Sequence, residues 1–246
     1  MTRHEERVWL VTGASRGLGR AVTEGALEAG DRVAGLARDV TSLAALDRKY
    51  PGRLLALPTD VSDRAAVFGA VDRAVAQLGG LDVVFNNAGE LLAGMVEEYT
   101  EEQVHDHLAV NFLGALWVSQ AVLPRLRARG AGHLFQVTSK GAGEGRGGYG
   151  LYGAGKAALK ALSEALADES RDFGVRVTML EPGPHATTLG NAMKSTPRLD
   201  VYDRTRRRLA AEAPPLGPVA STRKSAARIL EIAGLSDPPI REPLEA

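Results

Sequence analysis

Cysteine is absent from this sequence of 246 residues, and its absence excludes disulfides, thiolate nucleophiles and thiolate metal sites. An excess of charge of either sign is also absent, because 30 Lys and Arg residues are matched by 30 Asp and Glu residues. This balance gives no electrostatic reason to expect nucleic acid or an anionic membrane as a partner. We therefore expect a small-molecule partner and no metal ion.

Long hydrophobic runs are missing as well, since no segment approaches the ~20 apolar residues that cross a bilayer. Residues 1–7 are charged and lack the apolar core of a secretory signal. These features predict a cytoplasmic protein. The 28 glycines follow no fixed period and form no long linker, which favours one domain over residues 1–246.

Short apolar runs alternate with longer amphipathic stretches along the chain. The expected strands are 8–12, 33–37, 54–57, 81–85, 133–138 and 175–180, with 238–244 as a candidate seventh strand. The expected helices include 18–29, 62–78, 100–127 and 152–173. This alternation predicts an α/β, doubly wound domain of the Rossmann type, with a parallel sheet of about seven strands and helices on both faces. Ligands bind such sheets beyond the carboxyl ends of the strands.

A glycine-rich turn follows the first strand, with glycines at 13, 17 and 19 just before the first helix. Such a turn lets the backbone approach a pyrophosphate, which the N-terminus of the helix also attracts. A glycine-rich turn without a ligand is one alternative. Another is the nucleophile elbow of a serine hydrolase, because residues 13–17 match its Gly-x-Ser-x-Gly pattern, with Ser15 as nucleophile and His185 as a late histidine. That elbow normally follows several strands, whereas Ser15 follows only the first.

Further motifs appear in a fixed order after this turn: Asn86-Asn87-Ala88-Gly89 after the fourth strand, Asn111 in the next helix, Ser139 at the end of the fifth strand, Tyr152 and Lys156 in the helix after it, and Pro182-Gly183 with Thr187 after the sixth. Over about residues 7 to 190, the ordered set resembles the classical short-chain dehydrogenase/reductase family. The resemblance implies a nicotinamide-dependent oxidoreductase with this fold.

The chemistry agrees with the spacing of these motifs. Tyr152 and Lys156 are four residues apart on an expected helix and share a face. An ammonium near the phenol favours phenolate, which brings the pKa of Tyr152 from about 10 toward the range useful for acid–base catalysis. The hydroxyl of Ser139 is placed to hydrogen-bond a substrate oxygen on which charge develops.

By resemblance, Lys156 also contacts the nicotinamide ribose, and Asn111 supports a water that passes protons to Lys156. The catalytic residues implied are Asn111, Ser139, Tyr152 and Lys156. The cofactor-binding residues implied are Gly13, Ser15, Arg16, Gly17, Leu18, Gly19, Arg38, Asp60, Val61, Asn87, Ala88, Gly89, Tyr152, Lys156, Pro182, Gly183 and Thr187.

The end of the second strand indicates which nicotinamide cofactor is used. By resemblance, Ala37 occupies the position where NAD enzymes carry a carboxylate, and Arg38 follows it. Arg38 can make charge-assisted bonds to the phosphate of NADP, with Arg16 as a second donor. We therefore expect NADP(H) rather than NAD(H), although a strand end misplaced by one residue would bring Asp39 to the ribose. Asp60 resembles an adenine-contacting residue and is also suited to cap a helix beside Ser62.

Residues 188–215 are expected to form the variable substrate lid of the family. The arginines at 204, 206, 207 and 208 either meet an anionic substrate or form a solvated helix face. Gly155 departs from the family, which usually has serine before its lysine, but no proton-transfer group is lost. The end of the chain lacks the Gly-Gly of the tetrameric reductases, so a homo-oligomer, dimer or tetramer, stays an open expectation.

Three functions remain in view. The first is an NADP(H)-dependent carbonyl reductase or alcohol dehydrogenase, which transfers a hydride between nicotinamide and a ketone or secondary alcohol with Tyr152 as general acid or base. The second is an NADP-binding redox sensor or regulatory module without turnover. The third is the serine hydrolase at Ser15. The sequence identifies neither the substrate nor the direction of the reaction.

Overall fold

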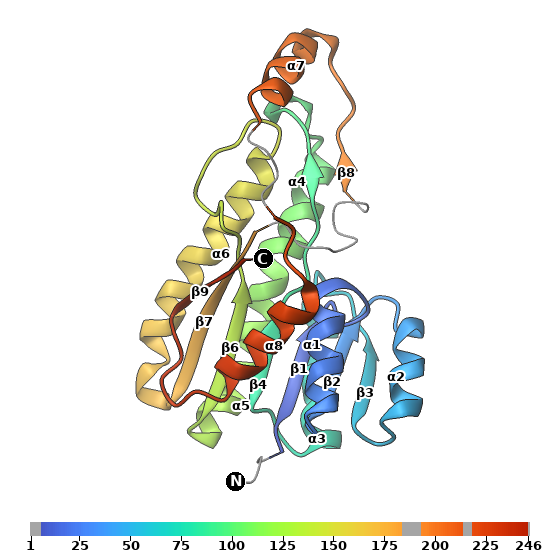
Figure 1. The fold of residues 1–246 in the computed structure, drawn as a ribbon, viewed down its shortest axis with the longest axis vertical. Helices are drawn as coiled ribbons and strands as arrows, with labels where there is room; N and C mark the ends of the chain where they lie inside the picture. The colour runs from blue at the N-terminus through green and yellow to red at the C-terminus, as the bar shows by residue number, and fades with distance from the viewer. Residues whose placement is uncertain (1–5, 184–192, 214–217, 246) are drawn as a thin grey trace.

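A computed structural model describes residues 6–183, 193–213 and 218–245. Its main feature is a seven-stranded parallel sheet in the order β3-β2-β1-β4-β6-β7-β9 (Figure 1). The strands are β1 (Val8–Thr12), β2 (Arg32–Ala37), β3 (Leu54–Pro58), β4 (Val83–Asn86), β6 (Gly132–Val137), β7 (Val175–Pro182) and β9 (Arg241–Leu244). The helices are α1 (Gly17–Glu28), α2 (Ala44–Lys49), α3 (Arg64–Leu78), α4 (Glu101–Leu108), α5 (Gly114–Arg129), α6 (Gly150–Glu169), α7 (Asp203–Ala211) and α8 (Thr222–Ala233).

The central strands are buried on both faces, as their sequences require. Every residue of β1, with the sequence VWLVT, is buried, and so is every residue of β6. Strands that are covered on both sides carry continuous apolar runs, because neither face meets water. The composition of β1 and β6 therefore places them in the middle of a three-layer domain.

Helices cover the two faces in separate groups (Figure 1). Side chains of α1, α2 and α8 join one apolar cluster with the sheet, whereas side chains of α3, α5 and α6 join the other. The chain crosses from β3 on one side of β1 to β4 on the other, so the strand order reverses at β1. Ligands of doubly wound folds bind in the crevice at the carboxyl ends of the strands flanking this reversal.

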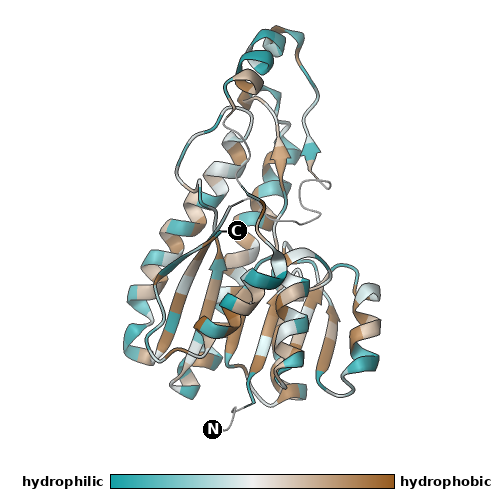
Figure 2. Ribbon diagram, in the orientation of Figure 1, coloured by the Kyte–Doolittle hydropathy of each residue, from teal (hydrophilic) through white to brown (hydrophobic). Residues whose placement is uncertain are grey.

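A smaller unit extends beyond the carboxyl ends of the strands (Figure 1). It contains a two-stranded ladder of β5 (Leu92–Ala93) and β8 (Lys194–Ser195), followed by α7. Figure 2 shows that α7 is mostly hydrophilic, in contrast to the sheet beneath it. We refer to the described residues 193–213 as the lid segment, which lies in the region that the sequence predicts as the substrate lid.

The predicted elements are confirmed, and the predicted fold class with them. Two local differences concern the site. The predicted helix over 100–127 contains a π-helical turn, η3 (Ala109–Leu113), between α4 and α5. Ser139 lies two residues beyond the end of β6 rather than within the strand. Both differences place predicted site residues, Asn111 and Ser139, in backbone that is neither α-helix nor strand.

The continuous helical stretch Glu101–Arg129 is long and apolar enough to cross a membrane by length and composition alone. In the structure, side chains of its α5 part pack against the sheet together with α3. A core helix passes the same test, so this stretch is weak evidence for a membrane span.

Candidate active site

The glycine turn between β1 and α1 has a backbone conformation and a tight packing that only residues without a side chain allow. Gly13 and Gly17 have φ angles of +66° and +56°, a region that favours glycine. A Cβ on Gly19 would lie 2.3 Å from the carbonyl oxygen of Gly13, so any side chain there would open the turn. α1 begins at Gly17 without a side-chain cap, and the uncapped N–H groups at the start of a helix attract anions.

The turn is fixed to the next motif by hydrogen bonds across the sheet. Thr12 Oγ1 accepts the backbone N–H groups of Asn87 and Ala88, each at 2.9 Å. Asn87 Nδ2 donates to the carbonyl of Thr12 at 2.9 Å, and Asn86 Nδ2 donates to the carbonyl of Ala115. The sequence places these two motifs 75 residues apart, and the structure joins them at the carboxyl ends of β1 and β4.

Asn111 lies in the π-helical turn η3 and is 1% exposed. Its side-chain amide forms a pair of hydrogen bonds with the backbone of Glu90: Oδ1 accepts the N–H at 3.1 Å, and Nδ2 donates to the carbonyl at 3.1 Å. Gly89 is next to this pair, where a Cβ would lie 2.9 Å from Asn111 Oδ1 and 3.7 Å from Lys156 Nζ. π-Helical turns inside α-helices are frequent at functional sites.

Lys156 and Tyr152 come from the first part of α6. Lys156 is buried, and its Nζ donates to the carbonyl of Val137 at 2.7 Å. Burial lowers the pKa of Lys156 to about 8, so the ammonium remains the main form at neutral pH. Tyr152 is partly buried and shares a side-chain hydrogen bond with Ser139. A phenol, a hydroxyl and an ammonium therefore meet at the carboxyl end of β6.

The pKa of Tyr152 differs from the sequence-based expectation. Burial raises it above 10, and the hydrogen bond with Ser139 offsets this only in part. Lys156 is not among the groups that lower this pKa, and its ammonium donates to the carbonyl of Val137. Tyr152 is thus a protonated phenol in this structure, the form that donates a proton.

The end of β2 lies where the sequence predicts it, at Ala37. Arg38 is exposed directly after the strand. Asp39 Oδ1 accepts the N–H of Thr41 at 2.8 Å, so this carboxylate is engaged in its own turn. Burial opposes ionisation of Asp60, but hydrogen bonds from Ser62 and the charge of Arg38 lower its pKa overall. Arg38, just after β2, and Asp60, just after β3, therefore lie close enough for their charges to interact.

The remaining predicted residues have varied settings. Asp63, rather than Asp60, caps α3 by accepting the N–H of Ala66, while Val61 is buried. Pro182 ends β7, and the N–H of Gly183 donates to Leu244. Thr187 and His185 lie outside the described residues. Ser15 has no histidine partner in the part of the chain that the structure describes.

The structure adds three residues that the sequence reasoning missed. His107 is fully buried one turn before Asn111, and its ring contacts that of Tyr152 edge to face, with 6.3 Å between centroids. Glu90 faces His107 at 3.9 Å and pairs with Lys194 of β8 at 2.9 Å. The one sequence signal for His107 was its i, i+4 spacing from Asn111.

A buried carboxylate fixes the lid segment. Glu98 has a fully buried side chain and accepts hydrogen bonds from Met95 N, Thr196 Oγ1, Leu199 N and Arg206. The bond from Leu199 is the largest of the effects that lower its pKa to about 2. Arg206 was predicted to meet an anionic substrate or to lie on a solvated face, but instead it joins α7 to Glu98.

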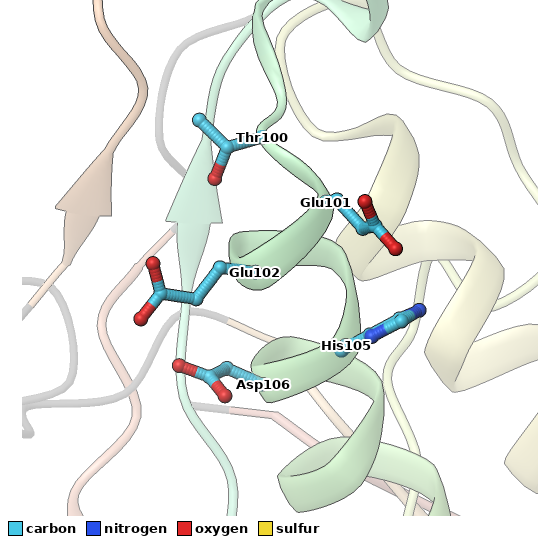
Figure 3. A pocket seen from close by; sticks show the side chains of 5 residues that line it. All are labelled: Thr100, Glu101, Glu102, His105 and Asp106. Carbon is cyan, nitrogen blue, oxygen red and sulfur yellow. The ribbon is translucent and has the colours of Figure 1, made fainter.

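One surface hollow lies elsewhere, on α4. It is lined by Thr100, Glu101, Glu102, His105 and Asp106. In Figure 3, Glu102 and Asp106 point to one side of the helix and Glu101 and His105 to the other. None of these residues belongs to the predicted site. Among residues 6–183, 193–213 and 218–245, no group of three or more His, Asp or Glu side chains is arranged to hold a metal ion.

Comparisons with known proteins agree with this geometry. The short chain dehydrogenase family matches residues 7–198. An oxidoreductase of Botryotinia fuckeliana, BOA17, is 35% identical over 96% of this chain and 87% of its own. A short-chain dehydrogenase from Streptomyces avermitilis is 36% identical, with a TM-score of 0.87 over 97% of this chain and 89% of that chain. An alcohol dehydrogenase from Thermococcus sibiricus is 25% identical, with a TM-score of 0.82 over 98% of this chain and 96% of that chain. The chain belongs to the short-chain dehydrogenase/reductase family of oxidoreductases.

Proposed function

We propose that this protein is an NADP(H)-dependent carbonyl reductase or alcohol dehydrogenase, with Tyr152 as general acid and base. The observation that supports it most strongly is the meeting of Tyr152, Ser139 and Lys156 at the carboxyl end of β6. These groups come from two elements, and their meeting beside the glycine turn has no evident structural need. A dinucleotide-binding sensor would require the glycine turn but not this cluster.

The residues around the turn fit a nicotinamide dinucleotide. The absence of Cβ atoms at Gly13 and Gly19 lets the turn pack closely on itself and against Asn87. The first turn of α1 would offer N–H groups to a pyrophosphate. Lys156 and the Asn87–Gly89 loop would hold the nicotinamide half. The neighbouring structure from Thermococcus sibiricus is that of an alcohol dehydrogenase complexed with 5-hydroxy-NADP, which supports a cofactor of this class.

The side chains of the cluster have distinct tasks. Ser139 would donate a hydrogen bond to the substrate oxygen and hold it next to the phenol. During reduction, Tyr152 would give its proton to that oxygen; during oxidation, it would take the proton from the alcohol. Lys156, one helical turn farther along α6, would stabilise the phenolate that results through its positive charge. The bound cofactor supplies or accepts the hydride.

Arg38 supports NADP(H) over NAD(H). It is exposed at the end of β2 and has no carboxylate before it, because Ala37 occupies that position. A guanidinium binds a phosphate monoester through paired charge-assisted bonds. Asp39, the residue that would disfavour a phosphate, is held in its turn by Thr41. Arg16, exposed at the start of α1, would add a second positive charge.

A ketone or secondary alcohol is the proposed substrate class. One relative, 33% identical over 74% of this chain and 65% of its own, is named 3-ketodihydrosphingosine reductase. Tyr149 and Met193 lie beside each other, with Tyr149 Oη 3.9 Å from Met193 Sδ, and they would form part of an apolar wall toward the lid segment. The cofactor exchanges its hydride with a single carbon of the substrate, a carbonyl carbon in a ketone or a carbinol carbon in an alcohol. A small molecule that carries such a carbon is therefore a suitable substrate.

The test compares Tyr152→Phe with the wild-type protein in a screen of carbonyl compounds that follows oxidation of NADPH and of NADH. Tyr152→Phe should abolish turnover and leave NADPH binding intact, because only the proton-transferring oxygen is removed. A variant that kept its turnover would overturn the proposal. Arg38→Ala should weaken NADPH binding but not NADH binding, and equal losses for both would refute the NADP(H) preference.

A further inference from the structure

Glu98 is a buried carboxylate that the proposed mechanism does not use. It lies in the 3-10 turn η2 (Val96–Glu98), between β5 and α4, and its side chain is fully buried. A buried carboxylate is costly unless hydrogen bonds and an opposite charge satisfy it. The partners that satisfy Glu98 therefore show which part of the molecule this residue holds.

Three of these partners come from the lid segment, and both carboxylate oxygens are used. Oε1 accepts the backbone N–H of Leu199 at 2.9 Å and a guanidinium N–H of Arg206. Oε2 accepts hydrogen bonds from the hydroxyl of Thr196 at 3.1 Å and from the N–H of Met95, in its own turn, at 2.9 Å. Thr196 follows β8, Leu199 comes before α7, and Arg206 lies within α7. One side chain thus holds three successive parts of the lid segment.

Two other polar contacts join the lid segment to the same stretch of chain, and both involve exposed side chains. Lys194, which pairs with Glu90, is 56% exposed. Tyr202 donates to Glu97 at the surface, with 2.7 Å between the oxygens. Exposed pairs contribute little, because water competes for both partners. We therefore assign the seating of the lid segment mainly to Glu98.

The seated lid segment lies against the loop before α6, the helix that carries the proposed proton donor. The N–H of Gly94 donates to the carbonyl of Gly148 in this loop at 3.0 Å. A Cβ on Gly94 would lie 2.2 Å from Thr196 Cγ2, so the same glycine also contacts the lid segment. Tyr149, at the start of α6, lies beside Met193. A shift of the lid segment would therefore change the substrate side of the site and leave the glycine turn in place.

We propose that Glu98 is a positioning residue for the substrate, which seats the lid segment over the site and takes no part in cofactor binding or proton transfer. The inference rests on the proposed function, because it assumes that the lid segment bounds the substrate. Arg206 then serves to neutralise Glu98, and its charge is not available to recognise an anionic group of the substrate.

Hydrogen–deuterium exchange tests the seating without turnover. Glu98→Gln keeps the size of the side chain but replaces one acceptor oxygen by an N–H donor, which faces the donors of the lid segment. We expect amide exchange in residues 193–213 to become on the order of 10-fold faster or more, while exchange in β6 keeps its wild-type rate. Glu97→Gln is the matched control, because it changes the neighbouring, exposed glutamate, and it should leave exchange of the lid segment unchanged.

Two results of this experiment would overturn the inference. One is wild-type exchange of the lid segment in Glu98→Gln. The other is an equal acceleration in β6, because the substitution would then have destabilised the whole domain.

A pair of arginine variants keeps the seating testable if Glu98→Gln folds poorly. Arg206→Gln removes the charge opposite Glu98, whereas Arg207→Gln changes the next residue of α7, which is exposed. Arg206→Gln alone should speed exchange of the lid segment. Equal exchange in the two variants would contradict the assignment.

Steady-state kinetics test whether the seating serves the substrate. With a ketone identified in the carbonyl screen, Glu98→Gln should raise KM on the order of 10-fold, with little change in kcat or in NADPH affinity, because it removes contacts to the substrate and none to the cofactor. A wild-type KM together with faster exchange of the lid segment would overturn the role in substrate positioning. If Tyr152→Phe left turnover intact, the proposed function would fail, and the exchange experiment would still decide whether Glu98 seats the lid segment.

Discussion

At the amino end of the sheet, polar side chains are bound up in the fold itself, whereas at the carboxyl end they meet around the proposed cofactor site. Asp31 is fully buried and accepts the backbone N–H of Arg7 and the indole N–H of Trp9, at 3.0 and 2.7 Å. Asp82 accepts the N–H of Val8 at 2.7 Å and pairs with Arg129. These carboxylates hold the first strand in place.

At the carboxyl end, the corresponding groups are divided among more elements and stay partly accessible. Ser139, Tyr152 and Asn87 are each partly exposed and come from β6, α6 and β4 or their flanking loops. This difference predicts which property a substitution at each end of the sheet should change. Changes at the amino end should alter the free energy of unfolding, and changes at the carboxyl end should alter binding or turnover.

The largest effect is expected from Gly19→Ala at the carboxyl end. The new Cβ would lie 2.3 Å from the carbonyl oxygen of Gly13 and 2.7 Å from Asn87 Nδ2, so the turn must open and its link to Asn87 must break. We expect loss of measurable NADPH binding in a fluorescence titration. Gly69→Ala is the matched control, because a Cβ on Gly69 in α3 meets nothing within 4 Å. Wild-type NADPH affinity in Gly19→Ala would show that this turn does not bind the cofactor.

The next effect concerns the amino end, where His133 should make stability depend on pH. Burial lowers the pKa of His133 to about 3, from 6.5. The unfolded chain takes up a proton below about pH 6.5, and the folded chain does not until about pH 3. Stability is therefore fully present above pH 6.5 and falls with decreasing pH, by up to ~1.4 kcal/mol per unit. Urea unfolding between pH 7 and pH 4 measures this slope.

His133→Gln should flatten that slope, because the group that titrates on unfolding is removed. Catalysis should change little at pH 7, since the His133 ring contacts Thr178 and Phe135 near the start of β6, whereas Tyr152 interacts with Ser139, which follows the end of that strand. A slope equal to that of the wild type would mean that His133 does not stay neutral in the folded state. A large loss of kcat at constant stability would contradict the assignment of stability to the amino end of the sheet and of catalysis to the carboxyl end.

The sequence was sufficient for the parts of the molecule that follow from local pattern. Continuous apolar runs such as Val8–Thr12 indicated the strands, and the spacing of Tyr152 and Lys156 indicated a shared helix face. The end of β2 at Ala37, on which the NADP(H) expectation depends, was also placed correctly. The family match then confirmed that the chain is a short-chain dehydrogenase/reductase, a family of oxidoreductases.

Features that depend on tertiary contacts could not be read from the sequence. The π-helical turn around Asn111 shows no local signal in its residues Ala109–Leu113, because the amide pairing with Glu90 belongs to the folded state. The pKa of Tyr152 was expected to fall, but burial, which the sequence does not give, raises it. From the sequence, Arg206 has the pattern of a surface charge. The structure pairs it with Glu98, which lies 108 residues earlier in the chain.

The smallest effect is expected from Gly155→Ala, a carboxyl-end change that should act on stability alone. Gly155 lies inside α6, where glycine costs about 1 kcal/mol relative to alanine. A Cβ there would meet Leu108 Cδ2 at 3.6 Å and Asn111 Cβ at 3.7 Å, which are ordinary contacts. We therefore expect Tm to rise by about 2–4 °C, with kcat unchanged, in a thermal melt and a turnover assay. A fall in kcat would mean that Asn111 tolerates no added contact. Residues of α6 would then affect both the stability and the turnover of the protein.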